Sequence, residues 1–495
     1  MLTAEQARAI QLVIDDGKNI AITGGAGVGK SFTIHHLAKA AREKGLVVAV
    51  TAATGIAALN IKGTTLHSFL GLGLAKGNVQ DLIKLAKKGK VKKRLTSTNL
   101  LIIDEMSMVD PVFLAVLDEV LRNVRKSMVK PFGGMRIVLV GDFAQLPPVV
   151  TRADMAGRVL HQHQDEAATF VFESPVWKSC VHEVVYLTQV QRQIGDARFF
   201  ELLNRMRIAC NTQEDIEIIR SRVVASLPSF DGIEPTRLYP LRADVGNINA
   251  THLQAIEAST VTFKAQVTSV PVSCGTNAFL IKSIQQQLDK AELRLVKSVP
   301  VDRELHLKVG AQVMLRHNVD VEGGLANGSR GIVTDYGIDP DSGTQEKVPR
   351  VRFVCGKEVL VCRNAWVSKL DGVGTVTFSQ IPLDLAWACT IHKSQGLTLD
   401  LVEMALDHTV FEFGQAYTAL SRARTLANTR ITSFDPSCIR AHPKVVAFYG
   451  GVCICPTPTP LAPLTSSIHG ESFFDDPPAD PSFPRLSKKP RKDSS

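Results

Sequence analysis

The sequence predicts an α/β protein, and two patterns support that prediction. Between Asn19 and Val150, apolar runs of strand length alternate with amphipathic stretches of helical period, which is typical of a doubly wound domain around a buried parallel sheet. A second βα region begins near Val184 and resumes from Leu383 to Phe434. At ~150 residues per domain, a chain of 495 residues indicates about three domains.

The predicted elements follow in chain order. Buried parallel strands are expected at residues 20–23, 46–52, 100–103 and 137–140, and a helix at 32–42 follows the first strand. A lysine-rich segment, 84–94, interrupts the pattern. Between residues 245 and 380, short β-like runs with glycine turns, such as 310–315 and 328–334, predict a small β insertion within the second α/β domain.

Composition excludes several classes of protein. Hydrophobic residues make up 45% of the chain and charged residues 21%, so most of it can bury a core. The net charge of +9 favours a polyanionic partner without identifying one. Nine scattered cysteines argue against a zinc or disulfide framework and favour a reducing compartment. The apolar stretch 47–59 is too short to span a bilayer, so we expect no membrane segment.

Residues 24–31 match the phosphate-binding pattern G-x-x-x-x-G-K-[ST] between a predicted strand and a predicted helix, as that pattern requires. Glycines let backbone N–H groups curl around a phosphate, Lys30 reaches the β- and γ-phosphates of ATP, and Ser31 ligates Mg²⁺. The alternative, a glycine-rich turn, does not explain this context. The predicted nucleotide contacts are Gly24, Gly25, Ala26, Gly27, Val28, Gly29, Lys30 and Ser31.

Two carboxylates end the predicted strand at 100–103. Asp104 would lie at the C-terminal edge of the sheet near Ser31 and hold the Mg²⁺ shell, and Glu105 would orient or deprotonate the attacking water. Such a pair is often only the start of a loop, but downstream of a P-loop it indicates ATP hydrolysis. Gln145 follows the strand at 137–140, where its amide would sense the γ-phosphate and report it through the Pro147-Pro148 turn.

These motifs lie among others that together resemble the petite-integration-frequency helicases, in the RecD-like branch of superfamily 1. Residues 51–59 look like motif Ia and residues 63–69 like motif Ib. The stretch from Ser107 through Pro131-Phe-Gly-Gly134 to Pro148 resembles the region that distinguishes this family from other RecD-like proteins. The match covers about residues 2–449 and continues through segments 307–315, 324–328, 390–396 and 417–423.

The resemblance implies two RecA-like P-loop domains in tandem, with a small wedge insertion in the first and an SH3-like β-rich insertion in the second. We expect the first domain at 1–183, with the wedge at about 75–96, and the second domain at 184–244 plus 381–450. The β-rich insertion would occupy 245–380. A Pro-rich tail with a basic end, expected to be disordered, would occupy 451–495 because nine of the 24 prolines lie between 456 and 490.

The resemblance also assigns residues around ATP. Gln6 would read the adenine edge, because one side-chain amide can donate and accept together. Arg192 and Arg422 would approach the γ-phosphate from the second domain, where a guanidinium neutralises the transition state. The family usually has an aromatic residue where Gln191 stands, a departure that leaves the charge of Arg192 intact.

The same resemblance implies a path for one DNA strand across both domains. Hydroxyls, amides and cations on phosphates would grip a strand without reading its sequence. For His67 alone, a buried structural histidine is the alternative. The residues of the path would be Thr54, Thr65, His67, His392, Lys393, Ser394 and Gln395.

The lysine-rich segment 84–94 has two interpretations. It is either a solvated face or, because its place between motifs Ib and II matches the strand-separating element of the family, a cationic wedge at the duplex junction; we favour the wedge.

The predicted function is an ATP- and Mg²⁺-dependent DNA helicase that translocates 5′ to 3′ on single-stranded DNA and unwinds forked or tailed duplexes. The direction comes from the resemblance alone. It would act in replication, repair, recombination or telomere maintenance. We expect a monomer whose tail contacts partner proteins. Two alternatives stay open: a helicase for RNA or RNA–DNA hybrids, and an ATP-gated clamp that displaces proteins without unwinding.

A basic cluster in the tail is a candidate localisation signal. Residues 485–492 carry five basic side chains, which a nuclear import receptor can read in an extended segment, although a solubilising tail or an auxiliary DNA contact would look the same. The first sixteen residues carry one arginine against Glu5, Asp15 and Asp16, which argues against a signal or mitochondrial presequence. We therefore expect a nuclear protein, with the cytoplasm as alternative and the mitochondrion disfavoured.

Overall fold

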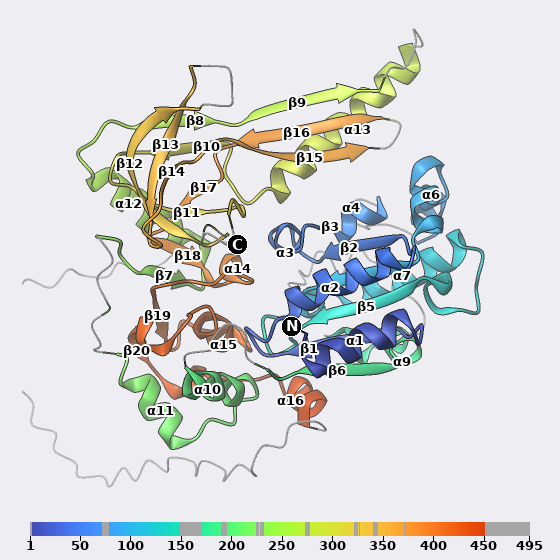
Figure 1. The fold of residues 1–495 in the computed structure, drawn as a ribbon, viewed down its shortest axis with the longest axis horizontal. Helices are drawn as coiled ribbons and strands as arrows, with labels where there is room; N and C mark the ends of the chain where they lie inside the picture. Colours follow the sequence, from blue (N-terminus) through green and yellow to red (C-terminus); the bar gives the residue numbers. More distant parts are fainter. Residues whose placement is uncertain are drawn as a thin grey trace, which may run out of the picture. The chain divides into compact units, whose positions relative to one another are not determined.

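A six-stranded parallel sheet forms the core of the first domain (Figure 1). The computed structural model describes residues 2–71, 79–148, 170–189, 196–223, 227, 232–272, 278–320, 325, 327–339, 345–370 and 373–450. The sheet order is β3-β2-β4-β5-β1-β6: Thr64–Thr65, Val48–Ala52, Leu100–Asp104, Arg136–Gly141, Ile20–Gly24 and Glu183–Leu187. The non-consecutive order of parallel strands confirms the predicted doubly wound α/β fold.

The strands β1, β4 and β5 are apolar runs that the fold buries on both faces. Side chains of α1 and α2, among them Leu12, Ile34 and Leu37, pack with β1 in one hydrophobic core. The helices of this domain are α1 (Ala4–Ile14), α2 (Lys30–Glu43), α3 (Gly55–Asn60), α4 (Leu66–Leu70), α5 (Val79–Ala86), α6 (Gly89–Ser97), α7 (Pro111–Val124) and α9 (Pro175–Cys180).

Strand β6 corrects one expectation. We expected a second βα region to begin near Val184, but β6 pairs parallel with β1 and so completes the first sheet. Its register places Val185 beside Ile22. An apolar strand carries no sign of which sheet it joins, so the sequence alone left this assignment open.

A four-stranded parallel sheet, ordered β18-β7-β19-β20, forms the second domain. These strands are Ala388–Thr390, Thr236–Tyr239, Val402–Leu406 and Thr429–Phe434. Its helices are α10 (Ala197–Arg207), α11 (Gln213–Arg220), α12 (Arg242–Ala255), α14 (Ile391–Ser394) and α15 (Gln415–Leu420).

Between β7 and β18 the described residues form three antiparallel sheets and a long helix. The five-stranded sheet, β14-β13-β12-β11-β17, contains Glu358–Leu360, Lys347–Phe353, Arg330–Ile338, Gln312–Leu315 and Leu383–Leu385. A three-stranded sheet joins β15 (Asn364–Leu370), β16 (Gly374–Gln380) and β9 (Gln266–Pro271), and β10 (Glu304–Leu307) pairs with β8 (Val261–Lys264). The SH3-like assignment stays a prediction.

The 21-residue helix α13 (Ala278–Ser298) was not expected in the β insertion. Ile284, Leu288 and Ala291 lie on one face of the helix and bury against Val376 of β16. The short β-like runs on either side favoured β structure for the whole region, which explains why the helical period was missed.

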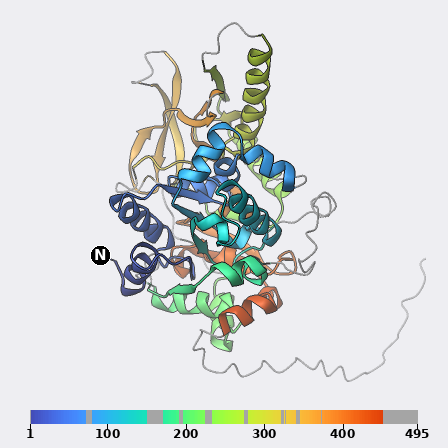
Figure 2. The same ribbon diagram turned by 90° about the vertical axis from the view of Figure 1, so that its right-hand side faces the viewer.

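The last described helix, α16 (Pro443–Gly450), returns to the first domain (Figures 1 and 2). It follows β20 of the second sheet, yet its Phe448 ring packs on Phe143, Phe172 and Trp177 at centroid distances of 5.2, 4.6 and 6.2 Å. Two segments of chain therefore pass between the domains, one after β6 and one before α16.

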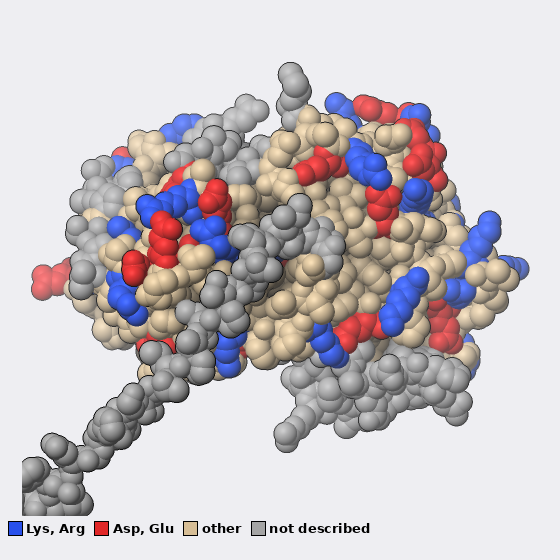
Figure 3. Space-filling view, turned by 90° about the horizontal axis from the view of Figure 1, so that it is seen from below, with Lys and Arg blue, Asp and Glu red and all other residues tan. Residues whose placement is uncertain are grey.

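The face drawn in Figure 3 mixes cationic and anionic side chains. Between α10 and α11, the exposed ion pair Arg198–Glu214 neutralises charge locally. Such a mixed face lacks the field of one sign that attracts a polyanion. Within the described residues, no helix combines the length and apolar character needed to cross a bilayer.

Candidate active site

The P-loop connects β1 to α2 and surrounds the amine of Lys30. Gly29 lies in the left-handed region at φ 85°, which disfavours any residue with a Cβ atom, and α2 begins at the next residue. Lys30 Nζ donates to the carbonyl oxygens of Gly24 and Gly25, both at 2.9 Å. Burial lowers the pKa of Lys30, although nearby carboxylates oppose that shift.

Asp104 and Glu105 lie where β4 ends, as predicted. Asp104 is buried and accepts the backbone N–H of Glu105 at 2.9 Å, and Glu105 has the unusual φ of 54°. Burial, and then the charge of Glu105, raise the pKa of Asp104 to about 7, and burial raises the pKa of Glu105. Two adjacent buried carboxylates are a group that a cation would stabilise.

The donor set fits a magnesium ion in part. Ser31 lies in the first turn of α2 and supplies a hydroxyl, and Asp104 supplies a carboxylate. Hard oxygen ligands of this kind suit Mg²⁺, which usually takes one or two protein ligands and completes its shell with phosphates and water.

Gln395, from the second domain, contacts two of the predicted catalytic groups of the first. Its Nε2 donates to Glu105 Oε2 at 3.2 Å and to Gln145 Oε1 at 3.3 Å. We expected Gln395 on the DNA path, whereas here its buried side chain bridges the water-activating carboxylate and the sensor amide. The contact lies between the two sheets, so it exists only when the domains are close.

Arg422 is buried at the same interface. Its Nε donates to the carbonyl oxygen of Thr418 at 2.9 Å and its Nη2 to Ser421 Oγ at 2.7 Å. Burial lowers its pKa, and the charge of Glu105 opposes the shift. Arg192 lies outside the described residues.

Gln6 takes part in the capping box of α1. Its Oε1 accepts the N–H of Thr3 at 3.0 Å, and Thr3 Oγ1 accepts the N–H of Gln6 at 3.2 Å. Gln6 Nε2 is buried and has no hydrogen-bond partner within the described chain. The donor half of the amide is therefore the half left for a ligand.

The predicted DNA residues divide into two groups. Thr54 and Thr65 accept backbone N–H groups at the starts of α3 and α4, which leaves their hydroxyl hydrogens to donate. The ring of His67 stacks on Phe113 with centroids 4.6 Å apart, and it is neither the buried structural residue of the alternative nor fully exposed.

In the second domain, His392 and Lys393 lie on α14 and keep partial exposure. Ser394 is buried and donates to the carbonyl oxygen of Ile391 at 2.8 Å. Its hydroxyl therefore closes the turn in this structure.

The lysine-rich segment forms the end of α5 and most of α6, and residues 75–78 of the predicted wedge lie outside the described chain. Arg125, after α7, holds the C-terminal end of α6: its Nη1 donates to the carbonyl oxygens of Leu95, Thr96 and Thr98 at 2.7, 3.1 and 2.9 Å. The exposed lysines of the segment are Lys84, Lys87, Lys88, Lys90, Lys92 and Lys93.

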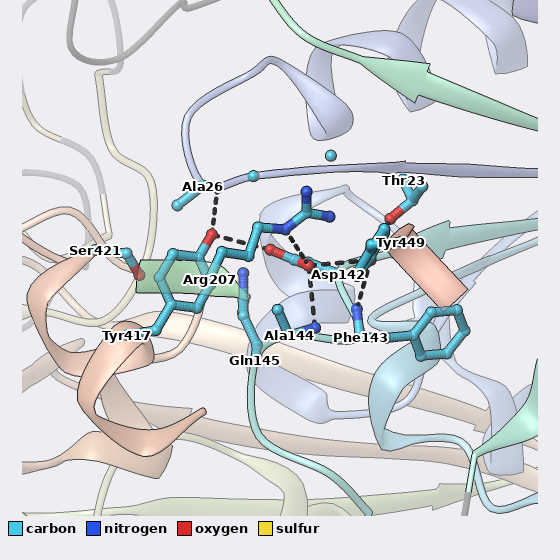
Figure 4. A network of polar contacts seen from close by, with 12 residues as sticks. Thr23, Ala26, Asp142, Phe143, Ala144, Gln145, Arg207, Tyr417, Ser421 and Tyr449 are labelled. Carbon is cyan, nitrogen blue, oxygen red and sulfur yellow. Dashed lines mark hydrogen bonds and ion pairs between the residues drawn. The ribbon is translucent and has the colours of Figure 1, made fainter. Parts of the chain in front are cut away.

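Sequence reasoning missed a second cluster beside the P-loop (Figure 4). Asp142 is completely buried and is contacted by Arg207, Tyr417 and Tyr449. Asp142 and Tyr417 lie within motifs of the helicase resemblance, which gave them no role. Arg207 and Tyr449 lie in none of those motifs. The available signal was an acidic residue directly after a buried strand, which requires a partner.

Comparisons with known proteins agree with the motifs. The family model "PIF1-like helicase" matches residues 1–211, and the model "DNA helicase Pif1, 2B domain" matches residues 294–336. The ATP-dependent DNA helicase PIF1 of Danio rerio is 40% identical over 449 residues, which cover 90% of this chain and 63% of the relative. The chain thus spans less than two thirds of that protein.

Two solved structures share the fold. The crystal structure of Pif1 helicase from Candida albicans superposes with a TM-score of 0.71 at 35% identity, over 92% of this chain and 100% of the other. A structure of Pif1 helicase from Bacteroides in complex with ADP-AlF3 and single-stranded DNA has a TM-score of 0.63 at 31% identity, over 91% of this chain and 97% of the other.

Proposed function

Because this chain belongs to the PIF1-like helicase family, we propose that it is an ATP-dependent DNA helicase. The observation that carries the proposal is the contact of Gln395 with Glu105 and Gln145, because it joins a second-domain amide to the predicted water-activating carboxylate. A site assembled from both domains can make hydrolysis depend on their approach, which is what a motor requires.

In the proposed cycle, the P-loop holds the phosphates of ATP with its N–H groups and with Lys30. To reach the phosphates, the Lys30 amine gives up its hydrogen bonds to the carbonyl groups of Gly24 and Gly25. Glu105 orients the attacking water and accepts its proton. Arg422 and Arg192 supply positive charge as the γ-phosphoryl group transfers. Gln6 donates its unpaired Nε2 to the base.

We assign Ser31 and Asp104 as the protein ligands of Mg²⁺. The ion, when bound, would neutralise charge on the phosphates during transfer. The raised pKa of Asp104 supports the assignment, because a carboxylate that is costly to ionise alone is stabilised by a cation.

The proposed substrate is single-stranded DNA with an adjoining duplex, as in the Bacteroides relative that was solved with single-stranded DNA. Thr54, Thr65, His67, His392 and Lys393 would contact phosphates. We further propose 5′ to 3′ movement, a wedge formed by α6, a first domain that extends through β6, and a monomeric motor that meets replication or repair partners through residues 451–495.

The test uses the purified 495-residue chain with two duplexes of equal sequence, one with a 5′ tail and one with a 3′ tail. We expect ATPase stimulation by oligo(dT), little by oligo(U), and unwinding of the 5′-tailed duplex only. Equal stimulation by RNA would favour the RNA helicase alternative. Stimulation by DNA together with displacement of a bound protein, but with no strand separation, would favour the clamp.

The proposed location is the nucleus, supported by the basic cluster at 485–492. A fluorescently tagged chain should accumulate in the nucleus, and removal of residues 485–495 should shift it to the cytoplasm while leaving ATPase turnover intact. Unchanged nuclear accumulation would contradict the role of the cluster, and mitochondrial signal from the intact chain would contradict the location.

A further inference from the structure

The buried carboxylate of Asp142 is surrounded by four hydrogen-bond donors (Figure 4). Its Oδ1 accepts from Arg207 Nε at 2.9 Å, from the Tyr449 hydroxyl at 3.1 Å and from the N–H of Ala144 at 3.1 Å. Its Oδ2 accepts from the Tyr417 hydroxyl at 2.9 Å. Three of the four donors are side chains distant in sequence, from α10, α15 and α16.

The two tyrosines also touch the P-loop and the strand that leads into it. The Tyr417 hydroxyl accepts the backbone N–H of Ala26 at 2.9 Å. The Tyr449 hydroxyl lies 2.8 Å from Thr23 Oγ1 and accepts the N–H of Phe143 at 3.1 Å. Each tyrosine hydroxyl donates its one hydrogen to Asp142, so its oxygen can only accept from other groups. The backbone N–H groups of Ala26 and Phe143 are such donors.

The buried charges of Asp142 and Arg207 require the residues of this cluster to act together. Asp142 is fully buried and Arg207 is only 8% exposed, with its guanidinium 4.0 Å from the centre of the Tyr449 ring. A buried carboxylate without its donors is strongly disfavoured, so removal of one partner weakens the rest. The arrangement is therefore complete only when α10, α15 and α16 are all in place.

The two tyrosines are anchored differently. Tyr449 lies on α16, whose Phe448 packs into the first domain, so it stays with the P-loop. Tyr417 lies on α15 of the second domain, five residues before Arg422, so it moves with that domain. Of the two hydroxyls at the P-loop, only that of Tyr417 changes its distance when the domains separate.

We infer that Tyr417 is a positioning residue that makes the shape of the P-loop depend on the approach of the second domain, and that Asp142 and Arg207 hold its hydroxyl in place. The inference rests on the proposed function, because it describes how the same ATP site responds to domain closure. Tyr417 touches the loop backbone and not the reacting atoms.

The test is Tyr417→Phe, which removes one oxygen atom and keeps the ring. The matched control is Tyr336→Phe, on β12, whose ring packs on Phe263 away from the ATP site. Two quantities are measured: oligo(dT)-stimulated ATPase turnover against the KM for ATP, and deuterium exchange of the nucleotide-free P-loop peptide that contains Ala26.

For Tyr417→Phe we expect stimulated turnover to fall about tenfold and the Ala26 peptide to exchange about tenfold faster, the effect of one lost hydrogen bond at a buried charged site. The KM should change much less. The melting temperature should fall modestly below that of Tyr336→Phe, because Asp142 loses one donor whereas the Tyr336 hydroxyl has no partner within the described residues. Asp142→Asn combined with Tyr417→Phe should lose no more turnover than the worse single variant, because the residues act as a unit.

Turnover and exchange equal to those of the Tyr336→Phe control would overturn the inference, and additive losses in the double variant would remove Asp142 from it. Failure of the proposed function looks different: the unaltered chain would then show no DNA-stimulated ATPase at all. In that case the exchange measurement decides whether Tyr417 holds the P-loop.

Discussion

In the proposed ATP site, the elements that adjoin a side chain set its position. Lys30, Asp104 and Glu105 are fixed by the strand or helix that immediately adjoins them, so a short motif suffices. The partner of Glu105 was not predictable, since Gln395 is 290 residues away and reaches it only through the fold. Asp142 escaped notice for the same reason, being 307 residues from Tyr449.

Glu105→Gln should separate binding from hydrolysis. The amide keeps the size of the side chain but cannot accept a proton, so ATPase turnover should fall at least about 100-fold while ATP and oligo(dT) still bind. Steady-state turnover and fluorescence anisotropy would measure the two effects. Lys30→Ala is the contrast, because it should lose nucleotide binding itself; normal turnover in Glu105→Gln would remove that residue from its role.

Arg422→Ala should lower turnover much more than ATP affinity. Its positive charge matters most as the transferring phosphoryl group develops charge, so a loss of about 100-fold in turnover is expected. Turnover at saturating ATP and equilibrium binding of a non-hydrolysable analogue would be compared. An affinity loss as large as the turnover loss would indicate a ground-state contact instead.

At the scale of elements, four of the six strands of the first sheet, β1, β2, β4 and β5, were predicted closely, because continuous apolar runs leave little choice of boundary. Placement of β6 and existence of α13 were not, because both depend on what the element packs against. The Pro131–Gly134 segment shows how a family signature can be structural: Gly133 has φ 60°, and a Cβ atom there would lie 2.6 Å from the carbonyl oxygen of Leu121. Arg125 Nε donates to the Gly133 carbonyl at 3.0 Å, and so ties this turn to α6.

Arg125→Met should loosen α6. Three carbonyl groups at the end of that helix would lose one shared donor, which we expect to cost about 2 kcal/mol of stability. Because α6 carries the proposed wedge, unwinding should fall with it. Thermal unfolding would be compared with Arg8→Met, whose arginine is 63% exposed and pairs with Glu183 at the surface, where a loss below about 0.5 kcal/mol is expected. Equal shifts in both variants would contradict the role of Arg125.

The pair Arg205–Asp215 between α10 and α11 should make stability depend on pH. Burial raises the pKa of Asp215, but hydrogen bonds from Arg205 and the Thr212 N–H outweigh it and leave the pKa below its usual value. A depressed pKa adds stability above the unfolded pKa of about 4 and loses it as pH falls further. Asp215→Asn should therefore melt lower than the unaltered chain at pH 7, with the gap narrowing below about pH 4. A gap independent of pH would show that the charge is irrelevant.

For the whole molecule, the exposed lysines of segment 84–94 should affect strand opening separately from movement along DNA. Replacing Lys87, Lys88, Lys92 and Lys93 with Gln should weaken unwinding of a forked duplex by about tenfold or more while most oligo(dT)-stimulated ATPase remains, because a junction wedge is not the motor. The control replaces four exposed lysines elsewhere: Lys39, Lys44, Lys178 and Lys347. Parallel loss of both activities would point to general DNA binding.

The return of α16 to the first domain also limits how the two domains can separate. A domain attached by one flexible segment can rotate about several axes and translate. A second attachment restricts these motions and favours rotation about the line that joins the two connections. The covalent loop also keeps the local concentration of each half near the other high, so reclosing needs little search. The two domains should therefore open by the same rotation each time.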